Sequence, residues 1–160
     1  MKDYLRDYCT EAFRFYASNG KTAEEYKNEI YNKALEEYTR HEEKGSGISC
    51  PTEAAIIAAE NKVIEMQAEI KDVEAVEMTM AEIASECRSH DIGQAVKIVY
   101  FKDPDKELKP GDISSRVHVA ELNIPASERS VYYYLKKART LFAEHRGLRT
   151  GNKKTSESLQ

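Results

Sequence analysis

The sequence predicts an all-α protein, and three observations support that class. Charged residues make up 32% of the chain, Gly and Pro together account for only eleven of its 160 residues, and Trp is absent. This composition is typical of proteins built mostly of helices. Apolar residues also recur at intervals of three and four, the period of an amphipathic helix. The length suits one domain or two small helical lobes, and it excludes a large enzyme fold with a separate cofactor domain.

Residues 1–43 predict two helices that pair as a hairpin. The first helix should stop at Asn19-Gly20, because glycine readily takes the left-handed conformation that ends a helix. The second should start at Thr22, which is followed three residues later by Glu25 in the arrangement of a capping box. The apolar faces comprise Leu5, Tyr8, Cys9, Ala12, Phe13 and Tyr16 in the first helix and Tyr26, Ile30, Ala34 and Tyr38 in the second.

Residues 44–51 predict a linker, because glycines and serines gather there between charged helices. Pro51 suits the first position of the next helix. From residue 52 to residue 88 there is no Gly or Pro, and apolar residues recur with alternating spacings of three and four, the pattern of a coiled-coil seam. The seam consists of Ile56, Ala59, Val63, Met66, Ile70, Val73 and Met80, with Glu77 also falling on it.

Two alternatives are open for residues 52–88. They form one long helix, or two helices broken near Lys71-Asp72, where Asp72 caps the second. The seam packs either within the chain or against a second copy, which would make the protein a homodimer through residues 52–88. Its methionines are expected to fill the core rather than bind a cofactor.

Residues 89–148 predict a helix-turn-helix domain. Ser89 caps a helix that ends before Asp103-Pro104, since the residue before a proline disfavours helical geometry. Asp112 is the expected N-cap of the following short helix. The inward residues expected of that helix are Ile113, Val117, Ala120 and, at its margin, Leu122.

The stretch "SERSVYYYLKKARTLFAEH", Ser127 to His145, predicts the longer helix that follows the turn. A short helix, a turn and a longer helix together form the unit that presents one helix to the DNA major groove. Tyr134, next to the apolar stripe, should be partly buried. The stripe comprises Val131, Leu135, Ala138 and Leu141 or Phe142; on the other side lie Arg129, Tyr132, Tyr133, Lys136, Lys137 and Arg139.

The candidate DNA contacts follow from these positions. Ser127 or Ser130 caps backbone amides or binds a phosphate, because a helix N-terminus favours an anion. Arg129 carries a planar fork that pairs with guanine O6 and N7, and Tyr132 or Tyr133 contacts a thymine methyl or a phosphate. The side chains placed to hold backbone phosphates are Lys136, Lys137 and Arg139. The competing interpretation is a core helix with a hydrated basic flank.

The charge is unevenly divided along the chain. From Ala126 onward eight Lys and Arg oppose three Glu, a net charge of +5, which leaves −9 for the first 125 residues because the whole chain carries −4. The C-terminal part is therefore expected to meet a polyanion. Residues 149–160 are polar and basic and predict a disordered tail.

The segments "AVKIVYF" (Ala95 to Phe101), "VAELNI" (Val119 to Ile124) and "SERSVYYYLKKAR" (Ser127 to Arg139) together resemble the promoter-reading region 4 of sigma-70-type factors. They are equally similar to bacteriophage-encoded transcription regulators of the ArpU and RinA kind. The likeness covers residues 92–146. It implies double-stranded DNA as a partner, with RNA polymerase as a further one. It also implies base or phosphate contacts for Ser127, Glu128, Arg129 and Ser130, and backbone contacts for Lys136 and Arg139.

The turn departs from the pattern of that family. Relatives run from Leu-Gly-Ile straight into Ser-Glu-Arg, whereas here Asn123 replaces the glycine and Pro125-Ala126 add two residues. Asparagine tolerates the left-handed conformation, so we expect the turn to close. The longer loop leaves the tilt of the recognition helix open. A domain that would melt a promoter is not apparent, so a complete sigma factor is not expected.

Other function classes find little support. The four histidines are scattered, Cys87 and His90 are two ligands without partners, and glycine-rich phosphate loops and hydrolase motifs are absent. We expect no catalytic residue, metal or cofactor. No apolar run could span a membrane, and "MKDYLRDYC" is no signal peptide, so a cytoplasmic protein is expected. The alternative function is a non-enzymatic adaptor of phage assembly, with a coiled-coil segment and a basic helix that binds an acidic protein surface.

Overall fold

The computed structural model describes residues 1–42, 52–86 and 90–150, and the regular structure in these ranges is entirely helical, which confirms the all-α class. The predicted linker, Pro51, Ser89 and most of the predicted tail lie outside the described residues. None of the described helices combines the length and apolar character needed to cross a membrane. The helices are α1 (Asp3–Asn19), α2 (Ala23–Glu42), α3 (Glu53–Glu65), α4 (Gln67–Ser85), α5 (His90–Val96), the π-helical turn η1 (Lys97–Phe101), α6 (Asp112–Asn123) and α7 (Glu128–Arg146).

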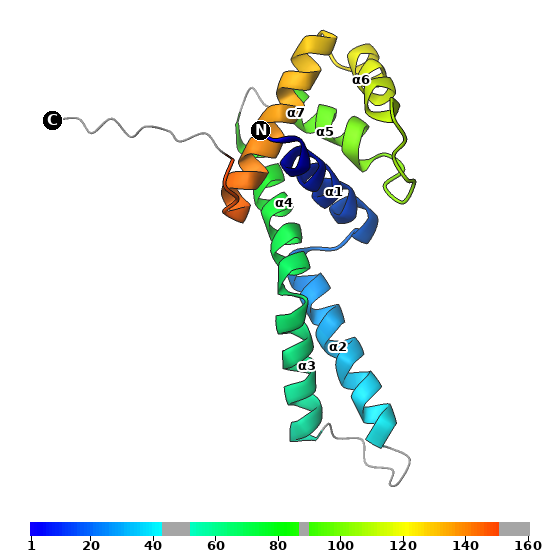
Figure 1. Cartoon of the computed structure of the whole chain (residues 1–160), viewed down its shortest axis with the longest axis vertical. Helices are drawn as coiled ribbons and strands as arrows, with labels where there is room; N and C mark the ends of the chain where they lie inside the picture. The colour runs from blue at the N-terminus through cyan, green and yellow to red at the C-terminus, as the bar shows by residue number, and fades with distance from the viewer. Residues whose placement is uncertain (43–51, 87–89, 151–160) are drawn as a thin grey trace, which may run out of the picture.

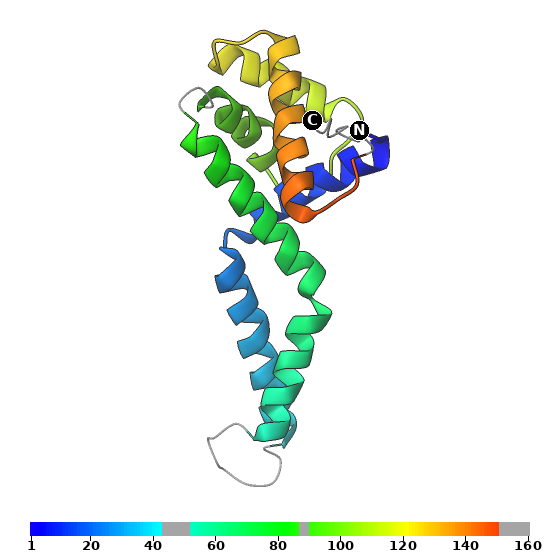
Figure 2. The same ribbon diagram turned by 90° about the vertical axis from the view of Figure 1, so that its left-hand side faces the viewer.

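The helices form a head and a projecting stalk (Figures 1 and 2). In the stalk α2 and α3 lie side by side in opposite directions. In the head α7 packs against α1, α4, α5 and α6. α4 starts at the top of the stalk and runs into the head, so it connects the two parts.

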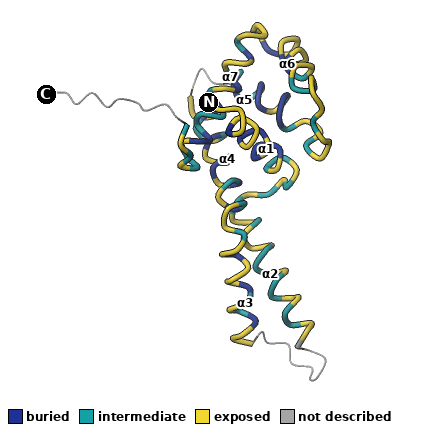
Figure 3. The backbone as a smooth tube through the Cα atoms, in the orientation of Figure 1, coloured by how far each residue is buried: buried dark blue, intermediate teal, exposed yellow. Residues whose placement is uncertain are grey.

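The core lies in the head, where the buried residues of α1, α4, α5, η1, α6 and α7 meet (Figure 3). Phe13 stands at its centre, with ring centroids 5.5 Å from Tyr100 and 5.6 Å from Phe142. Contacts at such distances add to the large apolar area that aromatic side chains bury. Phe142 is fully buried whereas Leu141 is only half buried, so Phe142 completes the predicted stripe of α7.

The predicted start and stop signals of the N-terminal helices are confirmed. α1 ends at Asn19, and Gly20 follows in the left-handed conformation with φ of 63°. The Thr22 backbone N–H donates to the Glu25 carboxylate at 2.9 Å, and the Glu25 N–H donates to the Thr22 hydroxyl at 3.2 Å. These local bonds form the capping box.

The pairing of those two helices is a correction to the sequence prediction. α1 packs against α4, η1 and α7 in the head, whereas α2 packs mainly against α3 and also contacts α4. The reason lies in their apolar faces. Leu5, Cys9 and Phe13 of α1 are buried and need a core on several sides, whereas the apolar side chains of α2 all keep some exposure and need fewer neighbouring helices.

The central segment forms two helices, and the break falls at Met66 rather than near Lys71-Asp72. The Met66 backbone has φ of −89° and ψ of 14°, yet its N–H bonds to the Lys62 carbonyl and its carbonyl accepts from the Ile70 N–H. The two helices therefore follow almost one course. Asp72 does not cap a helix, because it lies inside α4.

The seam predicted over residues 52–88 is used within the chain. Ala59 and Val63 are buried in α3, which packs on α2, and Ile70 and Val73 are buried in α4, which packs on α1, α2 and α7. The seam thus packs on α2 before Met66 and on several helices of the same chain after it. Any contact with a second copy through residues 52–88 must use another face of these helices.

The loop between η1 and α6 is fixed by a buried arginine. The Arg14 Nη2 atom donates to the backbone carbonyls of Asp103, Pro104 and Lys106, the second of these at 3.0 Å. Asp103, in this loop, has a positive φ of 46°, and among the non-glycine residues of the described ranges it is alone in this. Because the buried Arg14 guanidinium donates to these carbonyls, the loop has a defined path over α1.

Two details of α6 differ from the prediction. Gly111, with φ of 90°, occupies the N-cap position, and the Asp112 carboxylate instead accepts the Lys109 backbone N–H at 2.8 Å. Leu122 is 86% exposed rather than inward, because Val117 and Ala120 already direct the helix to the core.

Candidate nucleic-acid interface

α6 and α7 pack together and are joined by the turn at residues 124–127. The turn closes differently from the expectation that Asn123 takes a left-handed conformation. Asn123 remains the last residue of α6, where its side-chain amide donates to the Val119 carbonyl at 2.7 Å. Ile124 is extended, with φ of −122° and ψ of 143°, and its buried side chain anchors the turn to the core. The turn therefore accommodates the two extra residues, Pro125 and Ala126, without any residue of positive φ.

The N-terminus of α7 is capped as predicted, by Ser127. Its hydroxyl accepts the Ser130 backbone N–H at 3.3 Å, and the two hydroxyl oxygens lie 3.0 Å apart. The remaining N–H groups of this first turn point away from the helix body and attract an anion.

One face of α7 carries an exposed row formed by Arg129, Tyr132, Tyr133 and Lys136, called here the outer row. Tyr132 is 39% exposed and Tyr133 is 64% exposed. Val131, Leu135 and Ala138 on the opposite face are fully buried, which fixes the rotation of the helix about its axis. Burial of that stripe therefore forces the outer row into solvent. Tyr134 is half buried, as predicted.

Lys137 and Arg139 do not join the outer row. The Lys137 Nζ atom donates to the Glu86 carboxylate at 3.0 Å, across to the end of α4. The Arg139 Nη1 atom donates to the Tyr100 hydroxyl at 2.6 Å, on the flank that faces η1. Both cations were predicted to hold phosphates, and each is instead directed to another part of the head. The pairing partners are 51 and 39 residues away in sequence, so no local pattern indicates them.

A small acidic group lies beside the start of α7. Ligand atoms of His118, Glu121 and Glu128 lie within 4.8 Å of one another, and the His118 Nδ1 atom is 3.6 Å from the Glu121 carboxylate. All three side chains are exposed, so water competes for any ion there. The negative charge disfavours a phosphate at this point, but a glutamate can accept a hydrogen bond from the cytosine amino group.

The other end of α7 is held by a charged cluster that sequence reasoning missed. The Arg146 Nε atom lies 2.6 Å from the Asp72 carboxylate, and the Tyr8 hydroxyl donates to both oxygens of that carboxylate at 2.6 and 2.7 Å. Burial first, and the adjacent Asp72 second, raise the pKa of Tyr8 to about 12. The cluster joins α1, α4 and α7, so it fixes the orientation of the helix that carries the outer row.

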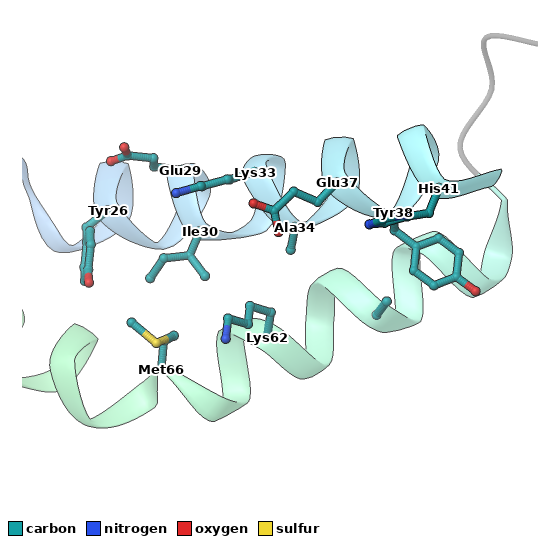
Figure 4. Close-up of a pocket in the computed structure, with 11 residues that line it drawn as sticks. Tyr26, Glu29, Ile30, Lys33, Ala34, Glu37, Tyr38, His41, Lys62 and Met66 are labelled. Atoms are coloured by element: carbon teal, nitrogen blue, oxygen red, sulfur yellow. The ribbon is translucent and has the colours of Figure 1, made fainter. Parts of the chain in front are cut away.

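A groove of about 520 Å³ runs between α2 and α3 in the stalk (Figure 4). Tyr26 and Ile30 of α2 lie across it from Met66, and Lys62 borders it from α3. The groove marks where two helices cover each other only in part. Its charged rim, Glu29, Lys33, Glu37 and Lys62, contains both signs and so favours no ligand of one charge.

Comparison of the chain with protein-family models, with curated proteins and with solved structures finds no match. Function is therefore inferred from the geometry of the chain itself.

Proposed function

We propose that the protein binds double-stranded DNA in a sequence-specific manner, as a transcription regulator of phage or prophage type, with α7 in the major groove. The outer row is the observation that carries this proposal. It combines a cationic fork, two aromatic side chains and a lysine on the solvent face of a helix that follows a short helix and a turn. Helices that read the major groove use side chains of these types.

The roles within the outer row follow from distance along α7. Arg129 lies in the first turn, where recognition helices reach base edges, so we assign it to a guanine. Tyr132 and Tyr133 follow as contacts to a thymine methyl or a phosphate. Lys136 lies two turns into the helix and suits a backbone phosphate. Ser127 caps the N-terminus of α7 by accepting the Ser130 N–H. Glu128 suits a cytosine amino group rather than a phosphate.

A titration of labelled duplexes selected from a random pool tests this proposal. Affinity should fall with salt, with a slope of log K against log salt near −0.9 for each phosphate contacted. Arg129→Ala should relax preference at one base pair by about 1–3 kcal/mol. Arg40→Ala is the matched control, because Arg40 is an exposed arginine on α2 in the stalk. Failure of every duplex to bind at low salt rejects the proposal.

A dimer on two half-sites about 34 Å apart would supply the affinity that one helix-turn-helix lacks. Since the predicted seam is used within the chain, we place the dimer contact on the outer face of α3. Ile57 and Ile64 are 49% and 69% exposed there, one heptad apart. Two large apolar side chains one heptad apart on the solvent face of a helix supply a seam on which a second helix can pack.

The same exposed isoleucines favour a second candidate function, a helical adaptor of phage assembly that binds another protein through the stalk. The two candidates differ in what mutation of α3 does. For an adaptor, Ile57→Ser with Ile64→Ser abolishes partner capture and Arg129→Ala leaves it unchanged. For a DNA regulator, Arg129→Ala alters sequence preference whether or not the stalk is changed.

A further inference from the structure

A cavity of about 780 Å³ lies in the head between α1, the loop before α6, η1 and α7. Its volume falls in the range of about 300–1,000 Å³ typical of small-molecule sites. The loop that forms one wall is the one Arg14 holds in place. Arg14 thereby positions the part of the loop that leads into this wall.

The cavity is lined by a guanidinium that lacks a counter-ion. Arg139 is partly buried, and its Nη1 atom donates to the neutral hydroxyl of Tyr100 at 2.6 Å. Its Nε atom is buried without a hydrogen-bond partner. Within the described ranges Arg139 forms no ion pair. Because a partly buried charge without a counter-ion is costly, binding of an anion beside Arg139 would be favourable.

Tyr100 provides a second hydrogen-bond donor beside Arg139. The residue is only 1% exposed, and its hydroxyl oxygen accepts from Arg139, which leaves the hydroxyl hydrogen available to donate. A guanidinium and a phenol side by side therefore offer donors to one acceptor. A carboxylate or sulfonate supplies that acceptor and the missing negative charge together.

Part of the cavity lining is apolar. Leu108 and Pro110 of the loop, Ile113 of α6, and Leu135 of α7 line it. A ligand that matches both the cationic and the apolar parts of the lining has an acidic group and an apolar body. An inorganic anion would leave the apolar wall in contact with water, and a neutral apolar molecule would leave Arg139 unpaired.

The other charged groups at the cavity largely compensate one another. The Asp7 carboxylate lies 3.6 Å from Arg6 Nε, and the Glu11 carboxylate lies 4.0 Å from Arg14 Nε. Lys109 lines the cavity without an ion pair in the described part of the chain. The two positions with uncompensated charge are thus both cationic, which favours an anionic ligand.

We propose that this cavity binds a small organic anion, with its acidic group on Arg139 and Tyr100 and its apolar body against Leu108 and Ile113. The site is separate from the outer row in chemistry, yet Tyr132 lines the cavity and also stands on the outer row. Binding of the anion itself does not depend on the DNA-binding function proposed above.

The test uses the full chain and 8-anilinonaphthalene-1-sulfonate, an aromatic sulfonate whose fluorescence rises in apolar sites. N-phenyl-1-naphthylamine, which has the same aromatic body without the sulfonate, serves as the neutral probe. We expect one sulfonate bound per chain, and weaker binding of the neutral probe, which reaches only the apolar part of the cavity. Arg139→Gln should weaken sulfonate binding by roughly tenfold or more and leave the neutral probe unchanged. Lys62→Gln, in the stalk groove, should change neither.

Leu108→Trp provides a second variant that keeps Arg139 and Tyr100 intact and narrows the cavity beside its apolar lining. It should weaken binding of both probes, and because the chain has no other tryptophan its emission reports whether the head is folded. Unchanged sulfonate binding in either folded variant overturns the proposal. Lack of saturable sulfonate binding to the wild-type chain overturns it as well.

Discussion

Arg146, the last residue of α7, lies 2.6 Å from Asp72 of α4 through its Nε atom, and the two side chains are only 20% and 15% exposed. The same carboxylate accepts two hydrogen bonds from Tyr8 of α1. One acidic side chain therefore connects the three helices that define how α7 is held.

Replacing Asp72 should destabilise the head strongly. Asp72→Asn leaves Arg146 as a mostly buried cation without its counter-ion, and we expect a loss of about 2–3 kcal/mol in the free energy of unfolding. Urea denaturation followed by circular dichroism measures it. Glu74→Gln, an exposed acidic residue of the same helix, is the control and should change the free energy by less than about 0.5 kcal/mol. Equal effects of the two substitutions would contradict the role assigned to the cluster.

Alkaline pH should destabilise the protein through Tyr8 and Cys9. Burial is the main reason that the pKa of Tyr8 rises from 10.0 to about 12 and that of Cys9 from 9.0 to about 11. Because the folded state holds these protons more tightly, the stabilisation is complete below the unfolded pKa values and is lost as pH rises through the folded ones. Unfolding measured between pH 8 and pH 12 should therefore show falling stability. Tyr8→Phe should remove the part that lies between pH 10 and pH 12.

Removing Arg14 should loosen the loop before α6. Arg14→Met retains the aliphatic stem but leaves three backbone carbonyls without their donor, at a cost of about 2 kcal/mol or more. Lys106 lies in this loop and is followed by Glu107, so limited trypsin digestion should cut after Lys106 faster in the variant. Arg40→Met controls for loss of an exposed arginine. A digestion rate equal to that of the wild type would show that other contacts fix the loop.

Two adjacent lysines of α7 should behave differently toward DNA. Lys136 is exposed in the outer row, whereas Lys137 is paired with Glu86. Lys136→Gln should weaken binding to all duplexes alike and reduce the salt slope by about 0.9. Lys137→Gln should leave that slope unchanged. The reverse order would mean that α7 is rotated relative to the duplex from the position proposed.

The oligomeric state tests the face assigned to the dimer. Ile57→Arg combined with Ile64→Arg places two charges on the exposed face of α3 and should convert a dimer to a monomer without affecting the head. Sedimentation or light scattering at micromolar concentration measures this change. Met78→Arg, at another exposed apolar position on α4, is the matched control. A wild-type monomer under these conditions would remove the dimer from the proposal.

Local signals in the sequence determined the all-α class and several helix ends. Gly20 ends α1, Thr22 and Glu25 start α2, and Ser127 starts α7, because each of these bonds joins residues at most four apart. The apolar stripe of α7 also followed from sequence, since a helical period fixes which residues share a face. The exposure of Arg129 and Lys136 is a direct consequence of that stripe.

Tertiary structure alone decided which helices pair and which cations are free. Both α1 and α3 have apolar faces that could receive α2, and the choice between them depends on how the whole core fills rather than on any local pattern. The same holds for Lys137, Arg139 and Arg146, whose partners lie just after α4, in η1 and in α4 respectively. Periodicity places a charged side chain on a face, but the energy of that charge depends on groups that only folding brings near it.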